Sequence, residues 1–225
     1  MSLYIVATPI GNLEDITLRA IRILKECDLV CAEDTRRTGI LLKKYKIGTR
    51  MISFNDHNKE KKTPFVIEEL KKEKNIAVVS DSGTPGISDT GFYLVREAIR
   101  NDIEIIPIPG ACAFLNALIA SGLATDRFTF YGFLPKKEGK KKELLQLIKS
   151  RDETAILYES PYRLLKDLES IKTIMPGAQI VVARELTKRF EEFVRGRVED
   201  IFEKLKDRKI KGEIVLLIGK SEQKD

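Results

Sequence analysis

The sequence is poor in the residues that build disulfide frameworks and zinc sites. Among its 225 residues are three cysteines, one histidine and no tryptophan. An odd, sparse set of cysteines does not form a disulfide framework, and Cys27-x3-Cys31 has no second Cys pair to complete a zinc site. We therefore predict that the cysteines are core thiols and that the chain holds no metal.

The sequence also lacks long apolar runs, and its first residues do not have the pattern of a signal peptide. No stretch approaches the roughly 18–20 apolar residues that a membrane-spanning helix needs. Residues 1–6 lack the basic segment and cleavage site of a signal peptide, and their pattern favours a first strand. We expect a cytoplasmic protein without membrane contact.

Positive charge is in excess. Lys and Arg number 40 against 34 Asp and Glu, which gives a net charge of +6. This excess suits an anionic partner without naming one. The densest basic segment spans residues 136–151, and two interpretations apply to it: contacts with the phosphates of an anionic partner, or a solvated helix face.

Strand and helix patterns alternate along the first half of the chain. Apolar, strand-like runs are separated by amphipathic segments, and they fall at residues 3–7, 28–32, 51–54, 76–79 and 103–108. One of the helices is predicted to start with Thr63 as its cap and Pro64 at its first position. Repeated β-loop-α units indicate a parallel sheet with helices on both faces.

The pattern changes after residue 122. Beyond it, strand-like runs that are partly aromatic alternate with helices, and the last runs are typical of antiparallel strands. We predict an α/β protein of two α/β domains, residues 1–122 with a mainly parallel sheet and residues 123–225 with a mixed sheet. The apolar helix at residues 111–121 is assigned to the first domain.

Three loops rich in glycine and proline follow predicted strands of the first domain, at residues 8–13, 80–91 and 107–113. In an open parallel sheet, ligands bind outside the carboxyl ends of the strands. Glycine also lets a ligand approach the backbone closely. Together the loops predict a cleft for a small molecule.

The loop SDSGTPGISDTG (80–91) indicates which ligand suits the cleft. It contains Asp81 and Asp89 but no Lys or Arg, and the chain has neither GxxxxGK[ST] nor a GxGxxG after the first strand. Carboxylates repel phosphate, whereas S-adenosylmethionine carries a sulfonium, an ammonium and a ribose diol. The alternatives are that Asp89 caps the following helix, or that both carboxylates bind magnesium.

Motifs in a fixed order connect the sequence to a known family. They include TPIGNLEDITLRA (8–20), EDTRRT (33–38), SDSGTPGISDTG (80–91), PIPGACA (107–113), ESPYR (159–163) and ARELTK (183–188). The sequence resembles the tetrapyrrole methylase superfamily and, within it, the branch that 2′-O-methylates a decoding-centre cytidine of 16S ribosomal RNA. The resemblance implies S-adenosyl-L-methionine bound in a cleft between two α/β domains, a homodimer, and 16S rRNA within the 30S subunit as the partner.

The resemblance also implies which residues bind the cofactor. They come from the three loops and from three motifs of the second domain: Pro9, Ile10, Gly11, Gly83, Thr84, Pro85, Gly86, Ile87, Cys112, Ala113, Tyr158, Glu185 and Glu213. Tyr162 stands where the ESPHR form of the motif has histidine, so no histidine base is expected there.

Methyl transfer to a hydroxyl needs alignment of the reactants and a base. Alignment supplies roughly 7–11 kcal/mol and a general base about 10²–10⁴-fold. Glu185 and Asp34 are the leading base candidates, ahead of Glu159, and an ion pair with a neighbouring arginine is the alternative for both. The residues expected to contact RNA are Arg36, Arg37, His57, Lys140, Lys141, Lys142, Arg163, Lys188 and Arg189.

Two other functions are compatible with this scaffold. One is a small-molecule methylase acting on a corrin precursor, and the other is a non-catalytic ribosome-binding protein. EDTRRT, ESPYR, ARELTK and the basic charge favour RNA methylation over the first, because they match the rRNA branch. The intact cofactor loops argue against the second.

Overall fold

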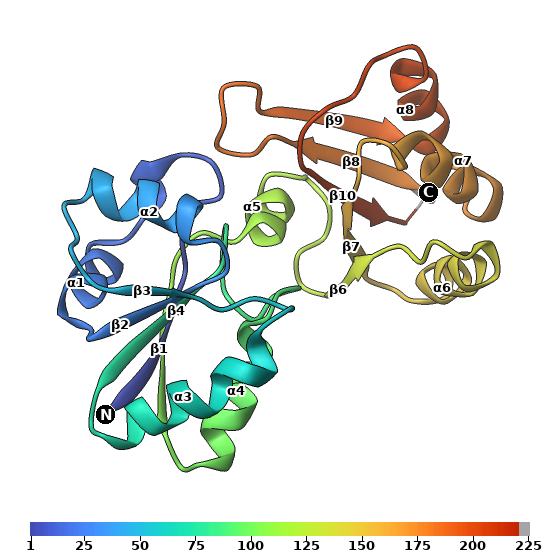
Figure 1. Ribbon diagram of the computed structural model, residues 1–225. Coiled ribbons are helices and arrows are strands. Elements are labelled where there is room, and N and C mark those ends of the chain that lie inside the picture. The colour runs from blue at the N-terminus through green and yellow to red at the C-terminus, as the bar shows by residue number, and fades with distance from the viewer. Residues whose placement is uncertain (221–225) are drawn as a thin grey trace. The chain divides into compact units, whose positions relative to one another are not determined.

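The structure is a computed structural model that describes residues 1–220. It divides into two compact units, Met1–Cys112 and Ala113–Asp225, and each unit contains one five-stranded sheet (Figure 1). One sheet is parallel and the other is mixed, which confirms the predicted fold class. No helix within the described residues combines the length and the apolar character needed to cross a membrane.

The sheet of the first unit is entirely parallel, with strand order β3-β2-β4-β1-β5. The strands are β1 (Ser2–Val6), β2 (Leu29–Ala32), β3 (Met51–Ser53), β4 (Asn75–Val79) and β5 (Glu104–Ile108). Every residue of β2 is buried, because helices cover both faces of the sheet. This explains why the central strands are continuous apolar runs in the sequence.

Two pairs of helices cover the two faces (Figure 1). On one face, α1 (Leu18–Glu26) and α2 (Thr35–Lys44) pack against alternate strand residues such as Val30. On the other face, α3 (Lys59–Lys71) and α4 (Gly91–Arg100) pack against the intervening strand residues, such as Cys31. A short 3₁₀ helix at Leu13–Asp15 precedes α1. The apolar core therefore lies in two layers, which leaves the strand ends for polar loops.

The start of α3 differs from the prediction. The sequence pattern puts Pro64 at the first helical position, but the helix already begins at Lys59 and Pro64 lies inside it. The carbonyl of Asn55 accepts hydrogen bonds from the backbone N–H groups of Asn58, at 3.0 Å, and Lys59, at 2.9 Å. This asparagine turn after β3 fixes the earlier start.

The sheet of the second unit is mixed, with strand order β6-β7-β10-β8-β9. The strands are β6 (Phe128–Phe133), β7 (Thr154–Glu159), β8 (Gln179–Arg184), β9 (Glu192–Arg197) and β10 (Ile214–Gly219). Only β6 and β7 are parallel to each other, and the remaining neighbours are antiparallel. The last strand within the described residues, β10, thus occupies the centre of the sheet.

Helices α6 (Glu138–Ser150), α7 (Leu164–Ile174) and α8 (Val198–Leu205) share one apolar core with this sheet. Helix α5 (Ala113–Ile119) contacts β7 and β10. The ring of Phe114 in α5 stacks on Phe130 of β6, with centroids 4.7 Å apart. These contacts place α5 in the second unit, whereas the sequence pattern predicts it in the first, with the boundary after residue 122.

Candidate functional site

The carboxyl ends of the parallel strands meet at one edge of the first sheet. In the strand register, Ile5 of β1 lies between Val78 of β4 and Pro107 of β5. Ala32 of β2 lies opposite Val79 of β4. The segments that follow β1, β2, β4 and β5 therefore start side by side.

Three of these segments are joined by hydrogen bonds. Thr8 and Gly83 form an antiparallel bridge, in which the N–H of Thr8 donates to Gly83 over 2.8 Å and that of Gly83 to Thr8 over 3.0 Å. The hydroxyl of Thr84 donates to the carbonyl of Ala111 over 3.2 Å. The three loops that the sequence predicts to form a ligand site are thus in contact within the first unit.

Two glycines permit this close arrangement. Gly83 has a φ of +81°, a backbone conformation that favours glycine. A Cβ atom on Gly110 would lie 2.8 Å from the Cβ of Ala7, which is closer than side-chain carbons approach. The backbone of the loops after β4 and β5 therefore depends on the absence of side chains.

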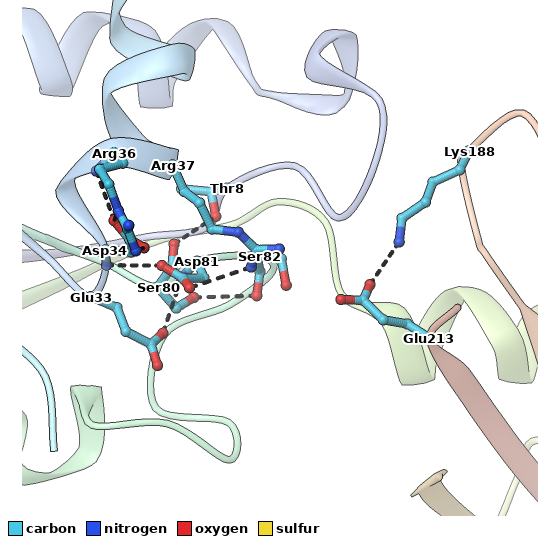
Figure 2. A network of polar contacts seen from close by, with 10 residues as sticks. All are labelled: Thr8, Glu33, Asp34, Arg36, Arg37, Ser80, Asp81, Ser82, Lys188 and Glu213. Atoms are coloured by element: carbon cyan, nitrogen blue, oxygen red, sulfur yellow. Dashed lines mark hydrogen bonds and ion pairs between the residues drawn. The ribbon is translucent and has the colours of Figure 1, made fainter. Parts of the chain in front are cut away.

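The two aspartates of the loop after β4 bind backbone groups. Asp89 Oδ1 accepts the N–H groups of Gly86 and Gly91, each at 2.7 Å, which favours the capping alternative, although the N-cap residue of α4 is Thr90. Asp81 accepts the N–H of Asp34 at 2.9 Å and the guanidinium of Arg37 at 3.3 Å (Figure 2). In residues 1–220 no group of three His, Cys, Asp or Glu side chains is placed to hold a metal ion.

Asp34 is the N-cap of α2. Its Oδ1 accepts the backbone N–H of Arg36 at 2.8 Å, and its Oδ2 lies 2.7 Å from Nη2 of the same residue (Figure 2). The side chain and backbone of Arg36 lower the pKa of Asp34 to about 2. Such a carboxylate is a weak proton acceptor at neutral pH. The structure thus favours the ion-pair alternative over catalysis for Asp34.

Glu33, at the end of β2, is a candidate that the sequence reasoning missed. Its Oε2 accepts the backbone N–H of Asp81 at 3.1 Å (Figure 2). Burial, together with the charges of Asp81 and Asp89, raises the pKa of Glu33. The Asp-Thr-Arg-Arg pattern could have revealed Glu33. It is typical of a helix that starts with Asp34 as its N-cap, which leaves Glu33 at the strand end.

The second sheet brings together three of the predicted motifs. Ile214 of β10 lies opposite Glu159 of β7 on one side and Arg184 of β8 on the other. The ESPYR segment, the β8–β9 hairpin and Glu213 therefore share one edge of this sheet. Tyr158 is half-buried there, with its ring 4.9 Å from that of Phe130.

Glu185 is held in an ion pair at this edge. Nζ of Lys188 lies 2.9 Å from Glu185 Oε1 and 2.9 Å from Glu213 Oε2, the second contact being visible in Figure 2. The backbone N–H of Glu213 also donates to Glu185 Oε1, over 3.1 Å. Burial opposes ionisation of Glu185, but these hydrogen bonds outweigh it and lower its pKa. Glu185 is thus a weaker base than a free glutamate.

A second group of charges is enclosed between β7, α6 and α7. Lys141 Nζ lies 2.6 Å from Asp167 Oδ1, and the two side chains are 3% and 0% exposed. Arg163 donates to Asp167 Oδ2 over 3.1 Å and to the carbonyl of Leu134 over 2.8 Å. Burial and a hydrogen bond with Asp167 raise the pKa of Glu159 to about 7. We call these four residues (Lys141, Glu159, Arg163 and Asp167) the buried charge cluster.

The prediction that Lys141 contacts RNA is wrong. Its side chain points into the second unit and its charge is neutralised by Asp167. Lys140 and Lys142, on the same helix, are exposed. Arg163 was also expected to contact RNA, but its guanidinium is engaged by Asp167 and Leu134. The α6 surface offered to solvent is therefore less basic than the sequence suggests.

The remaining predicted RNA contacts are distributed over both units. Arg36 and Arg37, whose side chains are 89% and 58% exposed, follow β2. His57 is exposed in the turn after β3, where its N–H donates to Asn55 Oδ1 over 3.1 Å. Arg189 is exposed in the β8–β9 hairpin.

The predicted cofactor residues of the first unit lie in its three connected loops: Pro9, Ile10, Gly11, Gly83, Thr84, Pro85, Gly86, Ile87 and Cys112. Cys112 is half-buried, whereas burial raises the pKa of Cys27 to about 11 and that of Cys31 to about 12, as expected for core thiols. Ala113 is the first residue of α5 in the second unit.

The chemistry of these loops fits S-adenosylmethionine. Segments 7–12, 80–91 and 107–112 contain no Lys or Arg. The carboxylates of Glu33 and Asp81 lie where β2 and β4 end. Asp81 is paired with Arg37, so the local charge depends on the lack of Lys and Arg in the three segments and on the nearby carboxylate of Glu33. These features favour a cationic ligand over a phosphate.

Comparison with known proteins gives matches over almost the whole chain. Residues 2–201 match the family of tetrapyrrole (corrin/porphyrin) methylases. The chain is 47% identical over 218 residues to ribosomal RNA small subunit methyltransferase I of Streptococcus pyogenes serotype M3, covering 97% of this chain and 76% of the relative. It is 48% identical over 224 residues to the protein of that name from Synechocystis sp., covering 99% and 80%.

Two solved structures share the fold at low sequence identity. Diphthine synthase has a TM-score of 0.77 and 16% identity, covering 98% of this chain and 90% of that one. Uroporphyrin-III-C-methyltransferase from Thermus thermophilus has a TM-score of 0.67 and 19% identity, covering 98% and 94%. These two likenesses concern the architecture alone.

Proposed function

Because the chain belongs to the ribosomal RNA small subunit methyltransferase I family of tetrapyrrole methylases, we propose that it methylates the 2′-hydroxyl of a cytidine in 16S rRNA. The observation that carries the proposal is the identity of 47% and 48%, across almost the whole chain, to relatives named as small-subunit rRNA methyltransferases. On the strength of the motifs, we extend the proposal in three ways. The cytidine lies in the decoding centre, the substrate is the 30S subunit, and the protein is a cytoplasmic homodimer.

We assign S-adenosyl-L-methionine as the methyl donor. When bound, it supplies an electrophilic methyl group whose departure leaves a neutral thioether. In the first unit it would be held by Pro9–Gly11, Gly83–Ile87 and Cys112, an assignment supported by the hydrogen bonds that join their loops. The contributions of Ala113, Tyr158, Glu185 and Glu213 are predictions from the motifs.

We assign Glu33 as the general base, in place of Glu185 and Asp34. A base works best when its pKa lies near the operating pH. Burial raises the pKa of Glu33, whereas hydrogen bonds lower those of Asp34 and Glu185. The pKa of Glu159 is also raised, but its side chain is buried beside Asp167, out of reach of a substrate, whereas Glu33 is only half-buried. The carboxylate of Glu33 would accept the proton of the ribose hydroxyl. Arg36, Arg37 and His57 are exposed near the ends of β2 and β3, where they can orient phosphates of the same RNA.

The test is transfer of labelled methyl groups to purified 30S subunits and to naked 16S rRNA. We expect label on a ribose 2′-oxygen. Glu33→Gln should lower the single-turnover rate about 10²–10⁴-fold. Glutamine keeps an oxygen that can accept the Asp81 N–H, so the loop contact survives. Asp34→Asn is the matched control, because asparagine also caps helices, and it should lose far less activity.

The pH profile provides an independent readout. The ionised form of Glu33 is the active one, so the wild-type rate should rise with pH up to the raised pKa of Glu33 and then level off. Glu33→Gln should lose this limb. Absence of label in both RNAs would refute the proposed function. Normal rates in Glu33→Gln, with label still on ribose, would refute only the assignment of the base.

A further inference from the structure

The β8–β9 hairpin, residues 185–191, presents an exposed aromatic ring. The ring of Phe190 is 64% exposed, and the guanidinium carbon of Arg189 lies 5.5 Å from its centroid. Among residues 1–220, Arg189 forms no ion pair, whereas Arg184 at the end of β8 lies 3.1 Å from Glu192. A large apolar group and a free positive charge are thus placed together in solvent.

The hairpin that carries this pair is held rigidly. Glu185 and Glu213 exchange hydrogen bonds of 2.9 and 3.1 Å, and Lys188 bridges their carboxylates. The N–H of Thr187 donates to Glu191 Oε2 over 2.6 Å. Leu186, 8% exposed, anchors the turn in the unit. Arg189 and Phe190 therefore lie in a loop that hydrogen bonds and ion pairs hold in place.

The backbone of the hairpin is also strained. Glu185 has a φ of +52° and Thr187 a φ of +63°, in a region that residues with side chains rarely adopt. Such a conformation is unfavourable for a residue with a side chain, and such strain gathers at functional sites. The exposed ring of Phe190 contributes little to the core, so core packing does not compensate for this strain. The arrangement thus points to a use outside the folding of the unit.

We propose that Arg189 and Phe190 form a stacking platform for an unpaired nucleobase of the RNA substrate, an inference that rests on the proposed function. Every base has an aromatic face that can stack on Phe190, and the guanidinium can meet a neighbouring phosphate. A flat ring beside an unpaired cation matches a nucleotide better than an apolar protein surface, which would leave Arg189 without a partner. The platform lies at the sheet edge that also carries Glu185 and Glu213.

The matched control for this platform is Phe92 of α4. Its ring is 62% exposed and has the guanidinium of Arg96 at 5.9 Å from its centroid. Arg96, however, also lies 3.5 Å from Glu97, and the pair sits on a regular helix. Phe92→Ala therefore removes an equally exposed ring from a site without the features of the hairpin.

The experiment measures the Kd for 30S subunits and for naked 16S rRNA by filter binding at several salt concentrations. Phe190→Ala should raise Kd about 5- to 150-fold, the effect of losing one stacked base. Phe190→Tyr should restore binding, and Phe92→Ala should leave it unchanged. The salt slope should persist in Phe190→Ala but fall by about one in Arg189→Gln, because only the arginine releases counterions.

Three results would overturn the proposal. One is an unchanged Kd in Phe190→Ala while the wild type methylates RNA normally. Another is an altered subunit stoichiometry of free Phe190→Ala in sedimentation, which would assign the ring to a contact with a second copy. A wild-type protein that neither binds nor methylates RNA would refute the proposed function itself, and the platform with it.

Discussion

Asp81 of the first unit and Asp167 of the second both connect separate segments, but in different surroundings. Asp81 is 26% exposed and links the ends of β2 and β4 through a backbone N–H and Arg37. Asp167 is fully buried and meets two cations, Lys141 and Arg163. A solvated carboxylate shapes a loop at small cost, whereas a buried one is stable only because its partners compensate it. The first arrangement leaves groups accessible to a ligand, and the second serves the fold.

The strongest test of this contrast is the removal of each carboxylate. Asp167→Ala should lower the free energy of unfolding by about 3–5 kcal/mol, because the buried Lys141 loses its closest counter-charge and keeps only Glu138, 3.4 Å away. Asp81→Ala should cost only about 1 kcal/mol, the net worth of a hydrogen bond. Urea denaturation gives both values. Equal losses would show that burial does not separate the two sites. The double variant Lys141→Met, Asp167→Leu should recover much of the stability that Asp167→Ala loses.

A smaller effect should appear in the pH dependence of stability. The pKa of Glu159 is raised from 4.5 to about 7 by burial and Asp167, so the folded protein binds this proton more tightly than the unfolded chain. The contribution of Glu159 to the free energy of unfolding is greatest below about pH 4.5 and falls as the pH rises to about 7. Glu159→Gln should therefore gain stability relative to the wild type between about pH 4.5 and 8. A constant difference between the two proteins would contradict this.

The smallest effect concerns lysines that are neighbours in sequence but not in environment. Replacement of both exposed lysines, Lys140→Gln and Lys142→Gln, should reduce the salt slope of RNA binding by up to about two. Lys141→Met should leave the slope unchanged and lower stability instead, because Lys141 is buried against Asp167. Filter binding and denaturation of the same variants distinguish the two effects. A reduced slope in Lys141→Met would contradict the assignment of this lysine to the core.

The order of the elements could be predicted from the sequence because each signal is local. Apolar runs mark the parallel strands, and Thr17, whose hydroxyl accepts the N–H of Ala20 over 3.1 Å, marks the start of α1. The start of α3 was predicted too late, since Pro64 is tolerated inside a helix whose first turn is fixed by Asn55. Gly122 was interpreted as a domain boundary, but packing of Phe114 on Phe130 assigns the preceding helix to the second unit.

The misjudged site residues depend on tertiary contacts. Lys141 belongs to a run of three lysines, and only its spacing of four and seven residues from Leu145 and Ile148 indicates that it faces the core. The pKa of Glu33 depends on burial and on charges brought by a distant loop, which no local pattern reveals. The convergence of the ligand loops was accessible, because parallel strands place their carboxyl ends at one edge.

The central position of β10 has a consequence for how the chain folds during synthesis. The first unit consists of elements that are contiguous in residues 1–112, so all of its strands exist before the second unit begins. The second sheet is different, because β10 pairs with both β7 and β8 and is made after the other four strands of this sheet. Until residues 214–219 leave the ribosome, β7 and β8 each expose an unpaired edge, which is a risk for misassembly. Folding of this protein is therefore vectorial for one unit and delayed for the other.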